Sequence, residues 1–281
     1  MGSISLIFAA LAAAATSPRQ SHRELKLTSR VDHAPPEESL NYWRYVVDDG
    51  LENPEALAAA DLDGDGQPEI MVGSEPDVTV HRVGAGGATG TWVRSVAATA
   101  TEPGEDLTFD NVFTTLCPAD LDGDGDVDFV AGGLENVILA WYENADGAGD
   151  TWTTHTITTS ADWANSVFGI DVDGDGDLDI ITGAYGRRTS FNPFGFDIGT
   201  GAYLRVYTNS GRGSFTQNTI LDSNDAKYIE GVTVADLDRD GDLDIIVLQR
   251  NRVVWFPNNG NRSYGNPKVI RQQNGLYPEG V

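Results

Sequence analysis

Beyond its N-terminal segment, the chain is a succession of short apolar and β-branched runs separated by Gly, Asn and Asp. The runs are rich in Val, Ile, Thr, Trp and Tyr, and no long segment keeps the 3.6-residue period of an amphipathic helix. Short runs of this kind, bounded by turn residues, are typical of antiparallel strands joined by tight turns. The pattern therefore predicts an all-β fold.

The runs recur in a fixed order around a nine-residue acidic motif. The motif reads DLDGDGQPE at 61–69, DLDGDGDVD at 120–128, DVDGDGDLD at 171–179 and DLDRDGDLD at 236–244. One run precedes each copy and three follow it, so each unit of about fifty residues is expected to form a four-stranded antiparallel meander. Four-stranded repeats of this length are typical of β-propeller blades, whereas β-helix repeats are shorter.

The motif has the chemistry of a cation-binding loop. In D-x-D-x-D-G-x-x-D, carboxylates stand at loop positions 1, 3, 5 and 9, and position 7 offers a backbone carbonyl. Hard oxygen ligands in this number suit Ca²⁺ better than Mg²⁺, and Gly at position 6 permits a sharp turn. Without a cation the crowded carboxylates repel one another, so the ion is expected to contribute to folding. Four copies with Gly at the same place disfavour the alternative of a merely acidic turn.

Two loops depart from the pattern. The first has Glu69 at position 9, which is longer than Asp but is still a carboxylate. The fourth has Arg239 at position 4, where the other loops have Gly, and its charge is expected to weaken cation binding there. Position 2 is apolar in every copy, which predicts that this side chain fixes the loop to the sheet below.

The acidic motif, the DIITGA-type run after it at 179–184 and the WYEN-type run at 141–144 resemble FG-GAP and VCBS repeats. These repeats are the blades of integrin α-chain-like propellers and of many secreted proteins. The resemblance covers about residues 41–281 and implies Ca²⁺, about four ions, in loops between the first and second strands of each blade. The same blade serves adhesion receptors, lectins and enzyme-associated modules, so the resemblance does not choose among these functions.

The metal ligands that the resemblance implies form four sets of five, with position 7 contributing its carbonyl. They are Asp61, Asp63, Asp65, Gln67 and Glu69 in the first loop; Asp120, Asp122, Asp124, Asp126 and Asp128 in the second; Asp171, Asp173, Asp175, Asp177 and Asp179 in the third; and Asp236, Asp238, Asp240, Asp242 and Asp244 in the fourth.

Composition excludes several classes of partner. The chain has 43 Asp and Glu against 18 Lys and Arg, a net charge of −25, which argues against binding nucleic acid or anionic lipid. Its single cysteine, Cys117, precludes an intrachain disulfide and a Cys-based metal site. No apolar run reaches the ~20 residues needed to span a bilayer.

The two ends of the chain differ from the repeats between them. Residues 1–15 contain an apolar run that ends in small residues, which predicts a cleaved signal peptide and secretion, and residues 16–40 are expected to form a polar linker. Residues 41–49, NYWRYVVDD, resemble a fourth strand with no blade before it. The C-terminal YPEGV at 277–281 repeats the YIEGV at 228–232 that precedes the fourth loop. These features predict a truncated propeller, an open arc of about four blades.

Catalytic signals are missing from the sequence. It contains no G-x-S-x-G, H-E-x-x-H or Walker motif, and the loops account for the spacing of its carboxylates, so no glycosidase pair stands out. Residues 185–202 form an insertion with two arginines and three phenylalanines, a candidate binding loop or a decoration without a ligand. Trp141, Tyr142, Trp163 and Trp255 are candidate sugar platforms, with core packing favoured for Trp141 and Trp255.

The sequence thus predicts a secreted, calcium-binding β-propeller, not an enzyme, that serves as a binding or adhesion module for an extracellular glycan or protein. Two alternatives stay open. The chain could be the non-catalytic module of a larger secreted enzyme, such as a polysaccharide lyase, or a scaffold without a ligand of its own.

Overall fold

The computed structural model describes residues 47–84, 92–99, 112–134, 138–161, 164–184, 187–191, 197–200, 202–223, 229–249, 252–260 and 262–272. Within these ranges the regular elements are all strands, and no helix long and apolar enough to cross a membrane occurs there. The expected signal peptide and linker lie outside the described residues. Of the expected strand at 41–49 only residues 47–49 are described, and they are not in a strand.

Four antiparallel sheets of four strands each make up the body of the molecule, as the repeats predict. We call them blades 1 to 4 in chain order. Blade 1 contains β1 (Ala56–Ala60), β2 (Glu69–Gly73), β3 (Asp77–Val83) and β4 (Trp92–Thr99), and blade 2 contains β5 (Val112–Ala119), β6 (Asp128–Leu134), β7 (Leu139–Asn144) and β8 (Trp152–Thr158). Blade 3 contains β9 (Ala164–Ile170), β10 (Asp179–Ala184), β13 (Ala202–Asn209) and β14 (Phe215–Ser223), and blade 4 contains β15 (Ile229–Ala235), β16 (Asp244–Gln249), β17 (Arg252–Phe256) and β18 (Lys268–Gln272).

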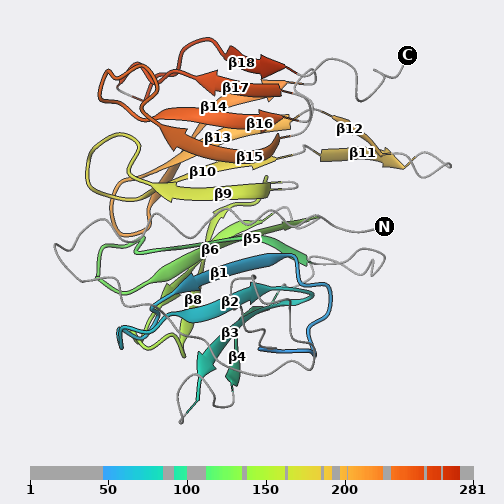
Figure 1. Cartoon of the computed structure of the whole chain (residues 1–281), viewed down its shortest axis with the longest axis vertical. Coiled ribbons are helices and arrows are strands. Elements are labelled where there is room, and N and C mark those ends of the chain that lie inside the picture. The colour runs from blue at the N-terminus through green and yellow to red at the C-terminus, as the bar shows by residue number, and fades with distance from the viewer. Residues whose placement is uncertain are drawn as a thin grey trace, which may run out of the picture.

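The insertion expected at 185–202 forms an additional hairpin in blade 3. Its strands β11 (Arg187–Phe191) and β12 (Asp197–Thr200) pair antiparallel with each other and belong to no blade. The hairpin leaves the end of the blade opposite to the acidic loops and extends away from the arc (Figure 1). Among the described residues it is the one strand pair that the repeating meander does not account for.

The blades follow one another along the molecule as an open arc. Their first strands β1, β5, β9 and β15 contact one another in sequence, so each blade packs on the next through its innermost strand. Blades 1 and 4 lie at opposite ends of the long axis (Figure 1). The sheets therefore form an open, propeller-like arrangement, as predicted, and are not closed into a barrel.

Three hydrophobic cores hold the arc together, one at each interface between consecutive blades. The first joins residues of blades 1 and 2, such as Met71 and Phe129, the second joins blades 2 and 3, and the third joins blades 3 and 4. Trp141 is 3% exposed and belongs to the second core, as expected. Burial of apolar surface between sheets is thus the main force that orients each blade on the next.

One boundary differs from the sequence pattern. The last run of the fourth unit reads YGNPKVI at 264–270 and predicts a strand there, but β18 begins at Lys268, and Tyr264 forms only an isolated bridge with Asn258. Gly265 and Pro267 explain the delay, because both residues are unfavourable inside a strand.

Candidate metal-binding loops

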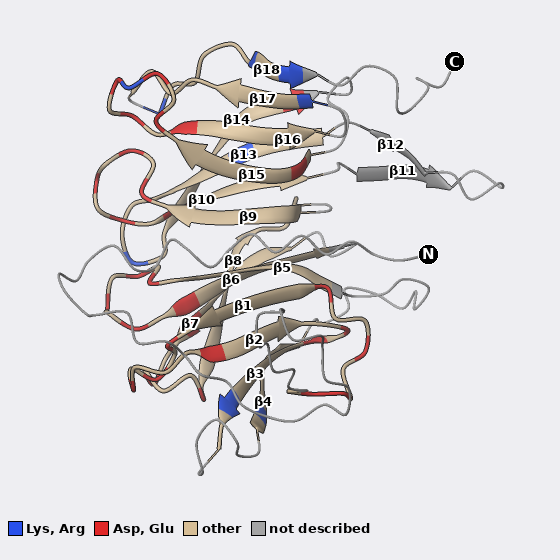
Figure 2. Cartoon of the chain, viewed as in Figure 1, with Lys and Arg blue, Asp and Glu red and all other residues tan. Residues whose placement is uncertain are grey.

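Each acidic motif forms the loop between the first and second strands of its blade. We call these segments loops 1 to 4: 61–69, 120–128, 171–179 and 236–244. All four lie at the same end of their sheets, where the carboxylates gather along one side of the arc (Figure 2). The meander explains this placement, since corresponding connections of successive blades emerge on the same side.

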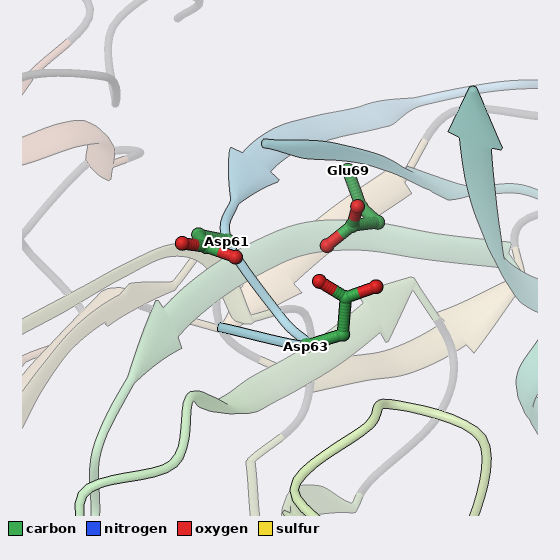
Figure 3. Close-up of side chains that lie close together, drawn as sticks. All are labelled: Asp61, Asp63 and Glu69. Carbon is green, nitrogen blue, oxygen red and sulfur yellow. The ribbon is translucent and has the colours of Figure 1, made fainter. Parts of the chain in front are cut away.

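Three carboxylates converge in every loop. Positions 1, 3 and 9 each offer an oxygen atom, and these oxygens lie within 4.8 Å of one another. The groups are Asp61, Asp63 and Glu69; Asp120, Asp122 and Asp128; Asp171, Asp173 and Asp179; and Asp236, Asp238 and Asp244. In loop 1, Asp61 stands at the end of β1, Asp63 on the loop and Glu69 at the start of β2, with the carboxyl groups of Asp63 and Glu69 facing each other (Figure 3).

The position 1 carboxylate organises the turn of the loop. In loop 3, one oxygen of Asp171 accepts the N–H of Gly174 at 2.7 Å and the other accepts the N–H of Gly176 at 3.0 Å. The residue at position 6 has a positive φ in all four loops, between 85° and 100°, which explains why it is always Gly. Position 4 is also left-handed, and Arg239 adopts φ 64° there in loop 4.

The position 9 carboxylate is buried and bonded to backbone. In loop 2, Asp128 is 1% exposed, and its two oxygens accept the N–H groups of Leu121 and Asn144, each at 2.9 Å. The pKa of Asp128 is raised to about 6, chiefly by burial and to a smaller extent by the charges of Asp122 and Asp124, although the two N–H groups act the other way. A cation between these carboxylates would offset both the burial and the repulsion.

The same arrangement recurs in the other loops. Burial raises the pKa of Asp179 in loop 3 to about 6, and it also raises the pKa of Glu69 in loop 1. The carboxyl group of Glu69 accepts the N–H of Leu62 at 2.8 Å, so the longer side chain still reaches the place that Asp takes in the other loops. The departure at Glu69 therefore leaves the cluster of loop 1 intact.

Two buried oxygen atoms in the clusters lack a hydrogen-bond partner among the described residues. They are Oδ1 of Asp61 in loop 1 and Oδ1 of Asp173 in loop 3. Buried polar atoms are otherwise almost always satisfied, so such atoms indicate a missing partner. Three converging carboxylates with orphaned oxygens fit a hard divalent cation, and the donor set is compatible with calcium.

The structure separates the predicted ligands into two groups. Positions 1, 3 and 9 converge, whereas position 5 is not part of the three-carboxylate clusters. In every loop one oxygen of position 5 accepts the N–H of position 7, as Asp65 does from Gln67 at 2.7 Å. Positions 5 and 7 therefore stay predicted ligands.

Asparagines at the ends of the third strands connect the loops to the next blade. Asn144, Asn209 and Asn258 are buried, and each side-chain amide donates to the position 2 carbonyl of the preceding blade's loop. Each also donates to the position 8 carbonyl of its own loop. Each backbone N–H meets the position 9 carboxylate of its own loop. We call these three residues the bridging asparagines.

Sequence reasoning gave the bridging asparagines no role. The signal that could have revealed them was the Asn that closes the third run in three of the four units, as in WYEN, VYTN and WFPN. Blade 1 has no Asn after β3, where Val83 is followed by Gly84. A residue type that recurs at the same place in a repeat, here the end of the third run, is a candidate support for the metal motif of that repeat.

Two histidines in the strands and the single cysteine make contacts within their blades. His81 is 1% exposed, its Nε2 lies 3.0 Å from Oγ1 of the buried Thr79, and burial lowers its pKa. Nε2 of His155 pairs with Glu143 at 2.7 Å. Cys117 lies in β5, and burial raises the pKa of its thiol to about 11, so it stays protonated and unreactive.

Most of the aromatic residues that the sequence offers as sugar platforms pack against other side chains of the protein. Tyr142 is 8% exposed and stacks on Phe129, with ring centroids 4.7 Å apart. The ammonium group of Lys268 lies 4.1 Å from the ring centroid of Trp255. Trp163 lies outside the described residues.

A family model described as FG-GAP-like repeat matches residues 120–182 and 196–247. These segments include loops 2, 3 and 4, so the matched family coincides with the repeats read from the sequence. No curated protein matches the chain.

Solved structures similar to this chain include a lectin from Agrocybe aegerita reported for specific recognition of non-reducing terminal N-acetylglucosamine. The two share 22% identity at a TM-score of 0.49, over 78% of this chain and 53% of the lectin, so the chain spans about half of the lectin's length. The Tc holotoxin pore of Photorhabdus luminescens matches with 16% identity and a TM-score of 0.28, over 81% of this chain and 12% of the toxin chain. BBS1N, solved in complex with ARL6DN, matches with 13% identity and a TM-score of 0.27, over 78% and 82% of the two chains.

Proposed function

We propose that this chain, an open propeller arc that contains FG-GAP-like repeats, is a secreted, calcium-stabilised and non-catalytic binding module. In this proposal the acidic loops bind Ca²⁺ and fix the arc, and the hairpin β11–β12 contacts a macromolecular ligand, either a glycan or a protein.

The calcium part of the proposal is supported by the chemistry of the clusters. Each offers three convergent carboxylates, and the position 9 members are buried at no more than 4% exposure. Buried carboxylates in such proximity destabilise a protein unless a cation is bound, so the ion and the fold are thermodynamically coupled. Calcium at extracellular concentrations suits such loops, which supports secretion as the setting.

The proposed ligand binding rests on one observation, the position of the hairpin β11–β12 between the second and third strands of blade 3. In the other blades only two to four residues separate the second strand from the third, whereas this connection adds β11 and β12. It carries Arg187, Arg188 and Phe191 in a chain with a net charge of −25. Arg and aromatic residues are enriched at recognition surfaces, and long connections on a rigid scaffold are frequent binding sites.

Deletion of the hairpin tests this proposal. Replacing residues 187–200 with a short Gly-Ser linker should leave the calcium-dependent melting curve nearly intact, because the hairpin pairs only with itself. The same change should abolish retention on a glycan array or in a protein pull-down with calcium present. The variant Arg187→Ala/Arg188→Ala should weaken that retention, whereas Arg271→Ala, which removes an arginine from the exposed strand β18, should not.

The outcomes separate the proposal from its alternatives. A collapsed melting curve after deletion would make the hairpin a structural element. A wild-type protein that retains neither glycan nor protein would favour a scaffold without its own ligand. Secretion is tested separately by expressing the chain with and without residues 1–15 and measuring its appearance in the medium or periplasm.

A further inference from the structure

The turns between the third and fourth strands reach across to the loop of the preceding blade. In blade 2, Gly149 stands beside Leu62 of loop 1, and in blade 3 the N–H of Gly213 donates to the carbonyl of Leu121 in loop 2 at 3.1 Å. Both glycines are left-handed, with φ of 65° and 64°. A side chain at either place would collide with the preceding blade, with Nη2 of Arg82 at 2.6 Å and with the Trp141 ring respectively.

Blade 4 has an arginine at the place where blade 3 has Gly213. Arg262 follows Asn258 by four positions, as Gly213 follows Asn209, and it keeps the left-handed conformation with φ 62°. A non-glycine residue in this region is strained, and such strain persists where the side chain has a compensating role. The arginine therefore replaces the residue type that the local backbone favours.

The side chain of Arg262 enters the cluster of loop 3. Its Nε donates to Oδ2 of Asp173 at 2.6 Å, and its Nη2 lies 3.7 Å from Oδ2 of Asp175. The side chain of Asp173 is only 9% exposed, and its other oxygen is one of the orphaned buried atoms. A guanidinium thus already occupies one side of a carboxylate that is expected to bind the cation.

The interface between blades 3 and 4 has a weaker asparagine bridge than the other two. The amide nitrogen of Asn258 lies 3.4 Å from the carbonyl oxygen of Val172, whereas the corresponding bonds of Asn144 and Asn209 measure 2.8 Å and 2.7 Å. Arg262 adds a charged contact at this interface. Its own carbonyl accepts a hydrogen bond from the side chain of Asn218 in β14 at 3.1 Å, so it is tied to blade 3 at both ends.

We propose that Arg262 is a resident counter-cation of loop 3, which joins blade 4 to blade 3 without metal and lowers the calcium affinity of that loop. The inference rests on the calcium binding proposed above. Loop 2 has no such arginine among the described residues, and the arginine nearest to loop 1, Arg82, lies 4.0 Å from Asp63. The loops are therefore unequal, and loop 3 fills after loop 2.

Arg262 and a calcium ion compete electrostatically for the same carboxylates. The guanidinium neutralises part of the charge of Asp173 and Asp175 and repels an incoming divalent ion at short range. Loop 3 therefore binds calcium with lower affinity, but its carboxylate charge is partly neutralised when calcium is absent. Removing the guanidinium charge should raise the calcium affinity of loop 3 about ten-fold, which is the size of effect expected from one modest repulsion between charges.

Calcium titration calorimetry on matched variants of the full chain tests the proposal. Arg262→Gly introduces the residue type that blade 3 has at this position, and Arg262→Gln removes the charge but keeps the backbone strain. Arg212→Gly is the control, because Arg212 is also left-handed, at φ 55°, and makes no ion pair within the described part of the chain. Each variant is also made together with Asp171→Asn, which disables loop 3.

We expect both Arg262 variants to bind one calcium ion about ten-fold more tightly than wild type, and only while Asp171 is intact. In chelator both should melt at a lower temperature than wild type, whereas Arg212→Gly should do neither. Unchanged or weaker calcium binding in both Arg262 variants would overturn the inference, as would an increase that persists with Asp171→Asn. A wild-type protein that binds no calcium would overturn it together with the calcium part of the proposed function, while a failed ligand screen would leave it standing.

Discussion

Nδ2 of Asn144 donates a hydrogen bond of 2.8 Å to the carbonyl oxygen of Leu62, across the interface between blade 2 and loop 1. The backbone N–H of the same asparagine donates to Asp128, and its Oδ1 accepts the N–H of Gly149 at 2.7 Å. One side chain thus couples two neighbouring acidic loops and the turn between β7 and β8. Order imposed on one loop by a cation can be transmitted through this contact to the next blade.

Asn144→Ala should therefore destabilise the protein by about 3 kcal/mol, because it leaves the buried carbonyl of Leu62 and the N–H of Gly149 without partners. The matched control is Asn259→Ala, which removes an exposed asparagine next to a bridging one and should change stability by less than about 0.5 kcal/mol. Urea unfolding in calcium measures both variants. Equal costs for the two would mean that the bridge contributes nothing beyond packing.

Calcium should raise the melting temperature, because an ion that binds only the folded state shifts the unfolding equilibrium by mass action. Asp171→Asn keeps an acceptor oxygen for only one of the N–H groups of Gly174 and Gly176, but it also removes one charge from loop 3 and so lessens the repulsion in the empty cluster. It should reduce the calcium-induced rise and have little effect in chelator. Asp222→Asn, which removes an exposed acid from β14, should leave the rise unchanged. Superimposable wild-type curves in calcium and chelator would refute calcium stabilisation.

Stability in chelator should fall as the pH rises from about 4 to about 6. Burial raises the pKa of Asp128 and of Asp179 to about 6, above the value of about 4 expected in the unfolded chain. In that window the folded state binds more protons than the unfolded state, so stability is greatest below the unfolded pKa and is lost as the pH rises through the folded one.

Saturating calcium should remove or reverse this pH dependence, because the ion binds the deprotonated carboxylates. Melting temperatures across this pH range, in chelator and in calcium, measure the difference. In chelator, Asp179→Asn should reduce the slope of melting temperature against pH as well as the melting temperature itself, since it removes one of the two carboxyl groups whose pKa is raised to about 6. A melting temperature that rises with pH in chelator would contradict the burial of these carboxylates as the cause.

Local pattern was sufficient to predict the blades and the loops from the sequence. The strand periodicity, the turn residues and the four Gly at position 6 all act within a single repeat, and in the structure β2, β6, β10 and β16 begin at the last residue of each motif. The convergence of positions 1, 3 and 9 also follows from a motif confined to nine residues. These features could be predicted because neighbours in sequence decide them.

Contacts between repeats could not be predicted in the same way. Arg262 and Asp173 are 89 positions apart, and Asn144 and Leu62 are 82 apart, so no local rule joins them. Their partners are fixed by how one blade packs on the next, which depends on the three interblade cores. The left-handed conformation of Arg262 was equally hidden, because arginine carries no sequence signal for a positive φ.

Position 2 of the loops provides the last prediction, because the same residue type there has two different environments. Leu62 is 1% exposed and belongs to the core between blades 1 and 2, whereas Leu237 is 41% exposed and belongs to none of the three cores. The difference arises because blade 2 covers loop 1, while no described residue of a following blade covers loop 4.

Leu62→Ala should therefore cost about 3 kcal/mol through lost apolar burial and an unfilled cavity, as is usual for a buried leucine. Leu237→Ala should cost less than about 1 kcal/mol, because much of its surface is already in contact with water. The pair is matched in residue type, loop position and substitution, so chemical denaturation of the two variants in calcium isolates the contribution of the neighbouring blade. Similar losses in both variants would show that the leucine acts within its own loop, and the covering blade would then add little to the stability of the site.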